Sequence, residues 1–201
     1  MQDLTPEHRV NGPSLFERVL GERFATLPPA LRRFHSLAGR HELWGLVETD
    51  APSSCAGRLL ARCLGTPTRA MHGPIRFVLE AAPDAETWTR HFPGGTLRSR
   101  MRFAPGHVVE RMGPARLTFL LDASGGRLRM RLVGLRFVGI ACPAWLRPRI
   151  VAEEAGDRVA AGDRLHFRIE AGVPGIGQVV GYRGHLMLPD ACAGESASPR
   201  G

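Results

Sequence analysis

The chain has 201 residues, of which 43% are hydrophobic and 23% are charged, and its formal net charge is +8. A chain of this length and composition suits one globular domain that buries roughly 70% of its unfolded surface, which excludes wholesale disorder and any need for disulfide or metal staples. No apolar run approaches the ~20 residues of a membrane-spanning helix, and the first residues lack the features of a signal peptide. The expected location is therefore the cytoplasm.

All 27 basic residues are arginines, because the sequence contains no lysine. Codon bias in a GC-rich bacterial genome is one explanation. The other is that the planar guanidinium group is needed to bind carboxylate or phosphate with two hydrogen bonds. The four cysteines lie far apart in the sequence without a C-x-x-C pair. We therefore expect neither a structural metal nor a disulfide framework, and no cofactor.

The N-terminal part of the chain predicts short helices. Residues 1–13 are polar and are expected to form a flexible leader. Ser14 and Glu17 have the spacing of a capping box, and the apolar residues that follow predict a helix that a proline pair ends. A short second helix is predicted around Phe34. A third is predicted after Ser54, with an apolar stripe formed by Leu59, Leu60, Cys63 and Leu64.

A first strand is predicted from His41 to Thr49, and beyond Gly73 apolar residues recur at every second position. Tight turns separate these runs, and the crossovers of a dozen or more residues that parallel strands need are absent, so the strands must be antiparallel. Eight to ten strands would expose long edges unless the sheet curls or closes. We therefore predict, over residues 14–189, a single mainly β domain built as a strongly curved antiparallel sheet or β-barrel with two or three short N-terminal helices. Residues 190–201 are expected to form a disordered tail, and a helix-grip fold is the competing architecture.

Familiar catalytic signatures are absent from the sequence. There is no nucleophile elbow, no zinc-protease motif and no P-loop, and the glycines around Ile176 precede a strand instead of opening a helix. The eight histidines are dispersed, so no metal site is expected. Glu153 and Glu154 face many arginines and are expected to form ordinary ion pairs.

The segment Gly181–Gly184 is the most distinctive local feature, because two glycines flank a Tyr-Arg pair within a predicted strand. Glycines at such positions indicate a kink or a close approach of another backbone. Successive side chains of a strand point to opposite faces, so one of Tyr182 and Arg183 is expected inside and the other outside. We take Trp88, Tyr182 and Arg183 as the candidate ligand-binding residues.

Arginines also alternate with apolar residues along the predicted strands, which indicates a basic outer face. The candidate partner surface on this face consists of Arg98, Arg100, Arg102 and Arg129. Sheets that bind RNA carry aromatic side chains among the basic ones, whereas here Phe103 and Phe119 fall on the opposite, apolar face. Nucleic acid is therefore a less favoured partner than an acidic protein or an anionic membrane surface.

Several segments together carry a resemblance to a known family. They are Leu15–Gly21 with Leu27–Leu31, Trp88–Arg90, Val109–Pro114, Pro174–Gly177 and Gly181–Gly184. In this order they resemble the bacterial domain of unknown function DUF4166, over roughly residues 14–188. The resemblance implies a bacterial origin and a possible partnership with an NAD(P)-dependent reductase, since domains of this family also occur fused to Rossmann-type reductases. It supplies no catalytic residue to transfer.

Three functional hypotheses follow. The first is a non-catalytic binding domain that holds a small apolar or amphipathic ligand within the curved sheet, and a fully packed interior would contradict it. The second is an enzyme of undetected type, which requires a titratable pair that converges in the cavity. The third is an accessory module that docks onto a reductase through the arginines of the outer face.

Overall fold

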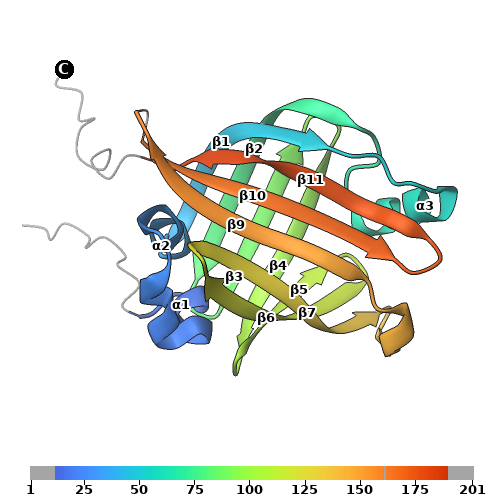
Figure 1. Cartoon of the computed structure of the whole chain (residues 1–201), viewed down its shortest axis with the longest axis horizontal. Coiled ribbons are helices and arrows are strands. Elements are labelled where there is room, and N and C mark those ends of the chain that lie inside the picture. The colour runs from blue at the N-terminus through green and yellow to red at the C-terminus, as the bar shows by residue number, and fades with distance from the viewer. Residues whose placement is uncertain (1–11, 161, 190–201) are drawn as a thin grey trace, which may run out of the picture.

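The computed structural model describes residues 12–160 and 162–189 (Figure 1), so most of the predicted leader and the whole predicted tail lie outside the described residues. These residues form a closed antiparallel barrel of ten strands with a short eleventh strand attached to it. The strands are β1 (Gly39–Thr49), β2 (Met71–Ala82), β3 (Ala85–Phe92), β4 (Gly95–Ala104), β5 (His107–Met112), β6 (Ala115–Ser124), β7 (Arg127–Phe137), β8 (Ile140–Ala141), β9 (Arg149–Val159), β10 (Gly162–Val173) and β11 (Gly177–Met187). The prediction of a mainly β fold with a barrel is confirmed.

Two sets of strand pairings complete the ring of the barrel. β1 pairs with both β2 and β11, and β6 pairs with β7 along ten residues of each strand, from Ala115–Phe137 to Ser124–Arg127. β7 and β9 also pair, but only from Arg127–Ala155 to Arg129–Glu153. We call this short contact the β7–β9 seam. The helix-grip alternative is wrong, because the described part of the chain has no long helix after the strands begin and the barrel surrounds side chains instead.

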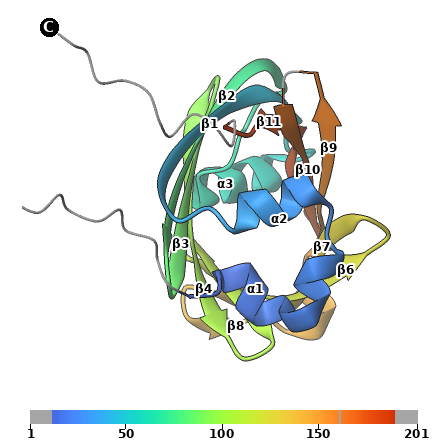
Figure 2. The same ribbon diagram turned by 90° about the vertical axis from the view of Figure 1, so that its left-hand side faces the viewer.

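Three short helical segments close one end of the barrel, where Figure 2 shows α1 and α2 lying across the opening. They are α1 (Leu15–Leu20), the 3₁₀ segment η1 (Gly21–Thr26) and α2 (Pro29–His35). The predicted capping box is present, because the Glu17 N–H donates to Ser14 Oγ and the Glu17 carboxylate accepts from the Ser14 N–H. Phe16 and Phe34 are fully buried and pack against Trp88 inside the barrel.

The third helix, α3 (Cys55–Leu64), lies at the opposite end. Ser54 caps it by accepting from the Gly57 N–H, and Gly65 ends it in the left-handed conformation. The predicted apolar stripe is only partly correct, because Leu59 is 66% exposed while Gly57 and Ala61 are buried. A Cβ at Gly57 would lie 2.9 Å from the Gln178 carbonyl oxygen, so the helix packs through its small residues.

The two faces of the barrel wall follow the predicted alternation. On β4, Leu97 and Met101 are buried, and the arginines between and beyond them are exposed. β3 departs from this rule, because its inward positions include the charged residues Glu86 and Arg90 beside Trp88. These two charged side chains are therefore inside a wall that is otherwise mostly apolar.

Gly184 marks a close approach of a neighbouring backbone, as predicted, whereas Gly181 lies against side chains. A Cβ at Gly184 on β11 would overlap the carbonyl oxygen of Leu46 on the neighbouring β1, and a Cβ at Gly181 would overlap the side chain of Gln178. Neither glycine has a positive φ angle. Gly184 is thus required by space and not by backbone conformation.

Replacement of Gly184 by alanine is expected to destabilise the fold by about 1–3 kcal/mol, because β1 and β11 must move apart to admit the methyl group. Urea denaturation followed by circular dichroism measures the change. Gly95→Ala is the matched control, because nothing lies within 4 Å of a Cβ there. Equal stability of the two variants would contradict the close approach.

Candidate functional site

The barrel contains a small cavity of about 80 Å³. Its wall is mostly apolar and includes three methionines. A few polar side chains also reach it, among them Arg90, Glu110, Glu154 and Tyr182. An apolar lining with a few convergent polar groups is typical of ligand sites, although the volume is below the roughly 300–1,000 Å³ of ordinary ligand pockets.

Arg90 is the most unusual of these side chains, because its guanidinium group is inside the barrel without a carboxylate partner. The residue is 7% exposed. Its Nη1 atom donates to Ser99 Oγ at 3.1 Å, and its Cζ atom lies 5.1 Å from the Trp88 ring centroid and 5.7 Å from that of Phe77. Among the described residues, no carboxylate oxygen lies within 4.0 Å of it.

Such a position is costly for a cation. Moving an ion out of water costs several kcal/mol even after the protein relaxes, and an opposite charge with good geometry is the usual compensation. The hydrogen bond to Ser99 and the two cation–π contacts offset only part of this desolvation cost, since a desolvated cation–π contact contributes about 2 kcal/mol. Four of the five N–H groups of Arg90 therefore remain available to another group.

Tyr182 lines the same cavity and packs edge-on against Phe92 and Phe167, with ring centroids 5.2 and 6.0 Å away. Burial raises the pKa of its hydroxyl above the usual value, and the positive charge of Arg90 opposes this rise, whereas Glu110 and Glu154 add to it. The hydroxyl therefore stays protonated and can donate a hydrogen bond. No partner for this donor occurs within residues 12–160 and 162–189.

A second buried polar group lies between the cavity and the helices that close the barrel. His35 Nε2 and Glu154 Oε2 are hydrogen-bonded at 2.7 Å, and the indole Nε1 of Trp88 donates to Glu86 Oε2 at 2.8 Å. Burial raises the pKa of the Glu86 carboxyl, although the charge of His35 and the Trp88 hydrogen bond lower it. In the part of the chain that the structure describes, His35 Nδ1 is buried without a hydrogen-bond partner.

The cavity reaches the β7–β9 seam. Ladder pairing between these strands ends at Arg129–Glu153, and the cavity wall includes Met130 on β7 and Ile150 and Ala152 on β9. These residues lie directly beyond the last paired position. The wall of the cavity is therefore made of unpaired strand edges at this place.

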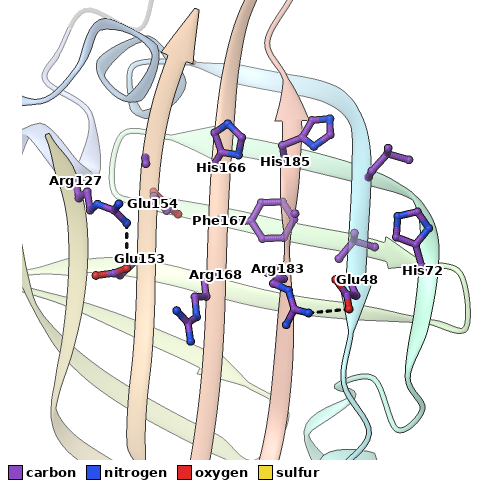
Figure 3. A pocket seen from close by; sticks show the side chains of 14 residues that line it. Glu48, His72, Arg127, Glu153, Glu154, His166, Phe167, Arg168, Arg183 and His185 are labelled. Carbon is purple, nitrogen blue, oxygen red and sulfur yellow. Dashed lines mark hydrogen bonds and ion pairs between the residues drawn. The ribbon is translucent and has the colours of Figure 1, made fainter.

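Of the predicted ligand-binding residues, the structure brings together Trp88 and Tyr182 but not Arg183. The first two line the cavity, and Arg183 lies on the outer face, where its Nη2 is 2.7 Å from Glu48 Oε1 and its Nη1 is 3.7 Å from Asp50 Oδ2. Figure 3 shows Arg183 beside Glu48 in an open groove of about 480 Å³ across β1, β11, β10 and β9. The prediction that Tyr182 and Arg183 face opposite ways is confirmed.

Two of the four arginines of the predicted partner surface form ion pairs with described residues, and the other two do not. Arg129 Nε lies 2.6 Å from Glu153 Oε1, and Arg98 Nη2 lies 3.6 Å from Glu80 Oε2. Arg100 and Arg102 are exposed on β4 and form no ion pair with any described residue. Glu153 thus makes the surface ion pairs that the sequence predicts, whereas Glu154 points inward to His35.

The residues that sequence reasoning missed are Arg90 and the buried pair of His35 and Glu154. A signal for Arg90 was present, because it alternates with Trp88 and Glu86 and must share their face. His35 and Glu154 form a buried titratable pair, of which only Glu154 lines the cavity, whereas the enzyme hypothesis requires a pair that converges there. No three His, Cys, Asp or Glu side chains within the described ranges lie close enough to hold a metal ion.

Tyr182 is the only tyrosine of the chain, so its ionisation can be measured directly by absorbance at 295 nm. In the folded protein the transition is expected above the ordinary value of about 10, and in denaturant it returns to that value. Stability is accordingly retained below pH 10 and lost as the pH rises through the folded-state pKa. Arg90→Gln is expected to raise the pKa further, and Arg183→Gln to leave it unchanged. Identical titrations of the folded and the unfolded protein would contradict the buried position.

Comparison with known proteins assigns the chain to a family. No curated protein matches the chain, and every helix of its described part is too short or too polar to cross a membrane. The crystal structure of Rv2717c from M. tuberculosis is similar, with 12% sequence identity and a TM-score of 0.46 over 82% of this chain and 99% of that one. The model of the domain of unknown function DUF4166 matches residues 27–186. The chain therefore belongs to the DUF4166 family.

Proposed function

We propose that this chain is a non-catalytic binding domain for a small amphipathic acid. The carboxylate of the ligand pairs with Arg90 inside the barrel, and its apolar part lies among the methionines of the cavity. The observation that carries the proposal is the buried guanidinium group of Arg90, which has one neutral hydrogen-bond partner and no carboxylate partner among the described residues.

Arg90 and Tyr182 are the polar groups of the cavity that suit a carboxylate, whereas Glu110 and Glu154, which also line it, repel one. A guanidinium group binds a carboxylate through two parallel hydrogen bonds, and charge-assisted bonds of this kind are about twice as strong as neutral ones. Tyr182 adds a neutral donor, because its raised pKa keeps the hydroxyl protonated. A cationic ligand would meet Arg90 as a like charge, and a purely apolar ligand would leave the guanidinium group uncompensated.

The size of the cavity limits which part of the ligand it can hold at rest. Its 80 Å³ is about half of the ~150 Å³ of a protein cavity that binds benzene. Met101, Met112 and Met130 line it, and methionine side chains change shape easily because they are unbranched. Binding therefore requires these side chains to move, and the short β7–β9 seam offers the direction in which an alkyl chain extends.

The other two hypotheses predict different behaviour. An enzyme that uses the pair of His35 and Glu154 would turn over a substrate, and His35→Gln would abolish this turnover. A module for a reductase would bind a partner protein whether or not Arg90 is present. Neither hypothesis accounts for an unpaired cation at the cavity.

Purified protein is expected to bind dodecanoate with a rise in melting temperature and to bind dodecanol much more weakly, since only the acid pairs with Arg90. Arg90→Met is expected to weaken dodecanoate binding about 10- to 100-fold, which corresponds to about 1.5–3 kcal/mol of charge-assisted hydrogen bonding. The same variant without ligand is expected to be at least as stable as the wild type, because a buried charge is removed. Isothermal titration calorimetry, native mass spectrometry and thermal unfolding measure these three quantities.

Arg183→Gln is the matched control, because it removes an arginine from the outer face of β11, next to Tyr182. It is expected to bind dodecanoate as the wild type does. Equal binding of the acid and the alcohol, or equal loss in the two variants, would show that Arg90 does not receive a carboxylate and would overturn the proposal.

A further inference from the structure

A row of arginines crosses four neighbouring strands on the outer face of the barrel. Arg100 on β4 is directly opposite Arg111 on β5, Arg111 is opposite Arg116 on β6, and Arg116 is opposite Arg136 on β7. We call these four exposed residues the arginine row. Like charges at directly opposite positions of a sheet destabilise it, so the arrangement carries a cost in the isolated protein.

No carboxylate offsets this charge within the described residues. None of the four arginines forms an ion pair there, although most other arginines of the strands do. Three of them, with Arg147, line a groove of about 880 Å³ whose wall contains no acidic residue. The Nε atom of Arg147 is buried there without a hydrogen-bond partner.

Exposed apolar side chains gather at the same end of the barrel. The four most exposed large hydrophobic residues of the described chain are Leu59 (66%), Val138 (69%), Ile140 (75%) and Trp145 (76%). Leu59 belongs to α3, and the others belong to the connection from β7 to β9, which includes β8 and η2 (Ala144–Leu146). In Figure 1, α3 and the turn of η2 lie at the right-hand end, opposite α1 and α2. We call these four residues the apolar rim.

The arginine row and the apolar rim meet. Val138 lines the groove together with Arg136, and its N–H donates to the carbonyl of Pro114 in the turn between Arg111 and Arg116. The same turn touches α3, because a Cβ at Gly113 would lie 2.9 Å from the Cys63 carbonyl oxygen. The two sets of side chains therefore form one continuous surface at the α3 end.

Val138 occupies this surface at a conformational cost. Its φ angle is +50°, the only positive value of a non-glycine residue in the described chain. A β-branched side chain is strained in this region, which Asn or Gly tolerates. Val138 is thus an apolar side chain exposed to solvent at a hairpin tip, where a polar residue would be less strained. Such strain is typical of a functional position.

We propose that the α3 end of the barrel docks on an anionic phospholipid surface. The arginine row and Arg147 pair with lipid phosphates, while the apolar rim inserts between the headgroups, and each basic residue near such a surface contributes about fivefold in affinity. Single-stranded nucleic acid is less suited, because only one aromatic side chain, Trp145, lies on the surface.

The test is co-sedimentation of the whole chain with vesicles of phosphatidylcholine and phosphatidylglycerol in a 7:3 ratio, with pure phosphatidylcholine as reference. Binding is expected only to the anionic vesicles and is expected to fall as salt rises. The variant Arg111→Gln/Arg116→Gln/Arg136→Gln is expected to lower the partition coefficient roughly 100-fold. Trp145→Ser is expected to lower it as well and to remove the blue shift of fluorescence on binding.

The matched control is Arg23→Gln/Arg32→Gln/Arg158→Gln, which removes the same charge from exposed positions at the opposite end. It is expected to bind as the wild type does. Equal losses in the two triple variants would reduce the effect to net charge and overturn the proposal. The proposal is also overturned if the wild-type chain does not bind anionic vesicles. It is overturned as well if single-stranded RNA binds the chain as tightly as the vesicles do, without a change in Trp145 fluorescence.

Val138→Asn separates stability from docking. It is expected to raise the melting temperature by about 2–4 °C, because the strain of the left-handed conformation is relieved. It is also expected to weaken vesicle binding severalfold, because one inserting side chain is lost. If the variant is more stable and binds vesicles as well as the wild type does, Val138 is not part of the docking surface.

Discussion

The rest of the structure depends on the closure of the sheet, which the long pairing of β6 with β7 completes. Closure satisfies the backbone groups of strands that would otherwise be edges, and it turns the two faces of a ribbon into an inside and an outside. Every inward position must then share a limited volume with α1 and α2, which close one end. A charge inside such a barrel cannot reach bulk water by a small rotation.

This constraint makes the charged positions of β3 informative. The wall accepts Glu86 because Trp88 donates to it and because its raised pKa favours the neutral form. The wall accepts Glu154 because its Oε2 atom is hydrogen-bonded to His35 Nε2 at 2.7 Å. Arg90 has neither an ionic partner nor a neutral form, which is why a ligand with an acidic group is the simplest way to complete its surroundings.

The sequence was sufficient to predict the architecture, since the alternation on strands such as β4 directly reports which side chains face inward. Of the candidate ligand-binding residues, Trp88 and Tyr182 line the cavity, whereas Arg183 is outside, paired with Glu48. What could not be predicted depends on contacts between distant segments. The pair of His35 and Glu154 joins residues 119 positions apart, and the arginine row depends on the registers of three strand pairs, which a period of two leaves undetermined. Leu59 is exposed for a similar reason, because close packing at Gly57 and Ala61 decides which side of α3 faces the barrel.

The shortness of the contact between β7 and β9 has a consequence for motion. Three residue pairs hold this part of the wall, whereas ten hold the wall between β6 and β7. Regions with few ladder hydrogen bonds open locally at a much lower free energy than global unfolding. Amide protons near Met130 and Ala152 should therefore exchange with solvent while the β1–β4 wall stays protected. The barrel can admit water or solutes on the timescale of this local fluctuation, and the rate of admission is then independent of the stability of the whole fold.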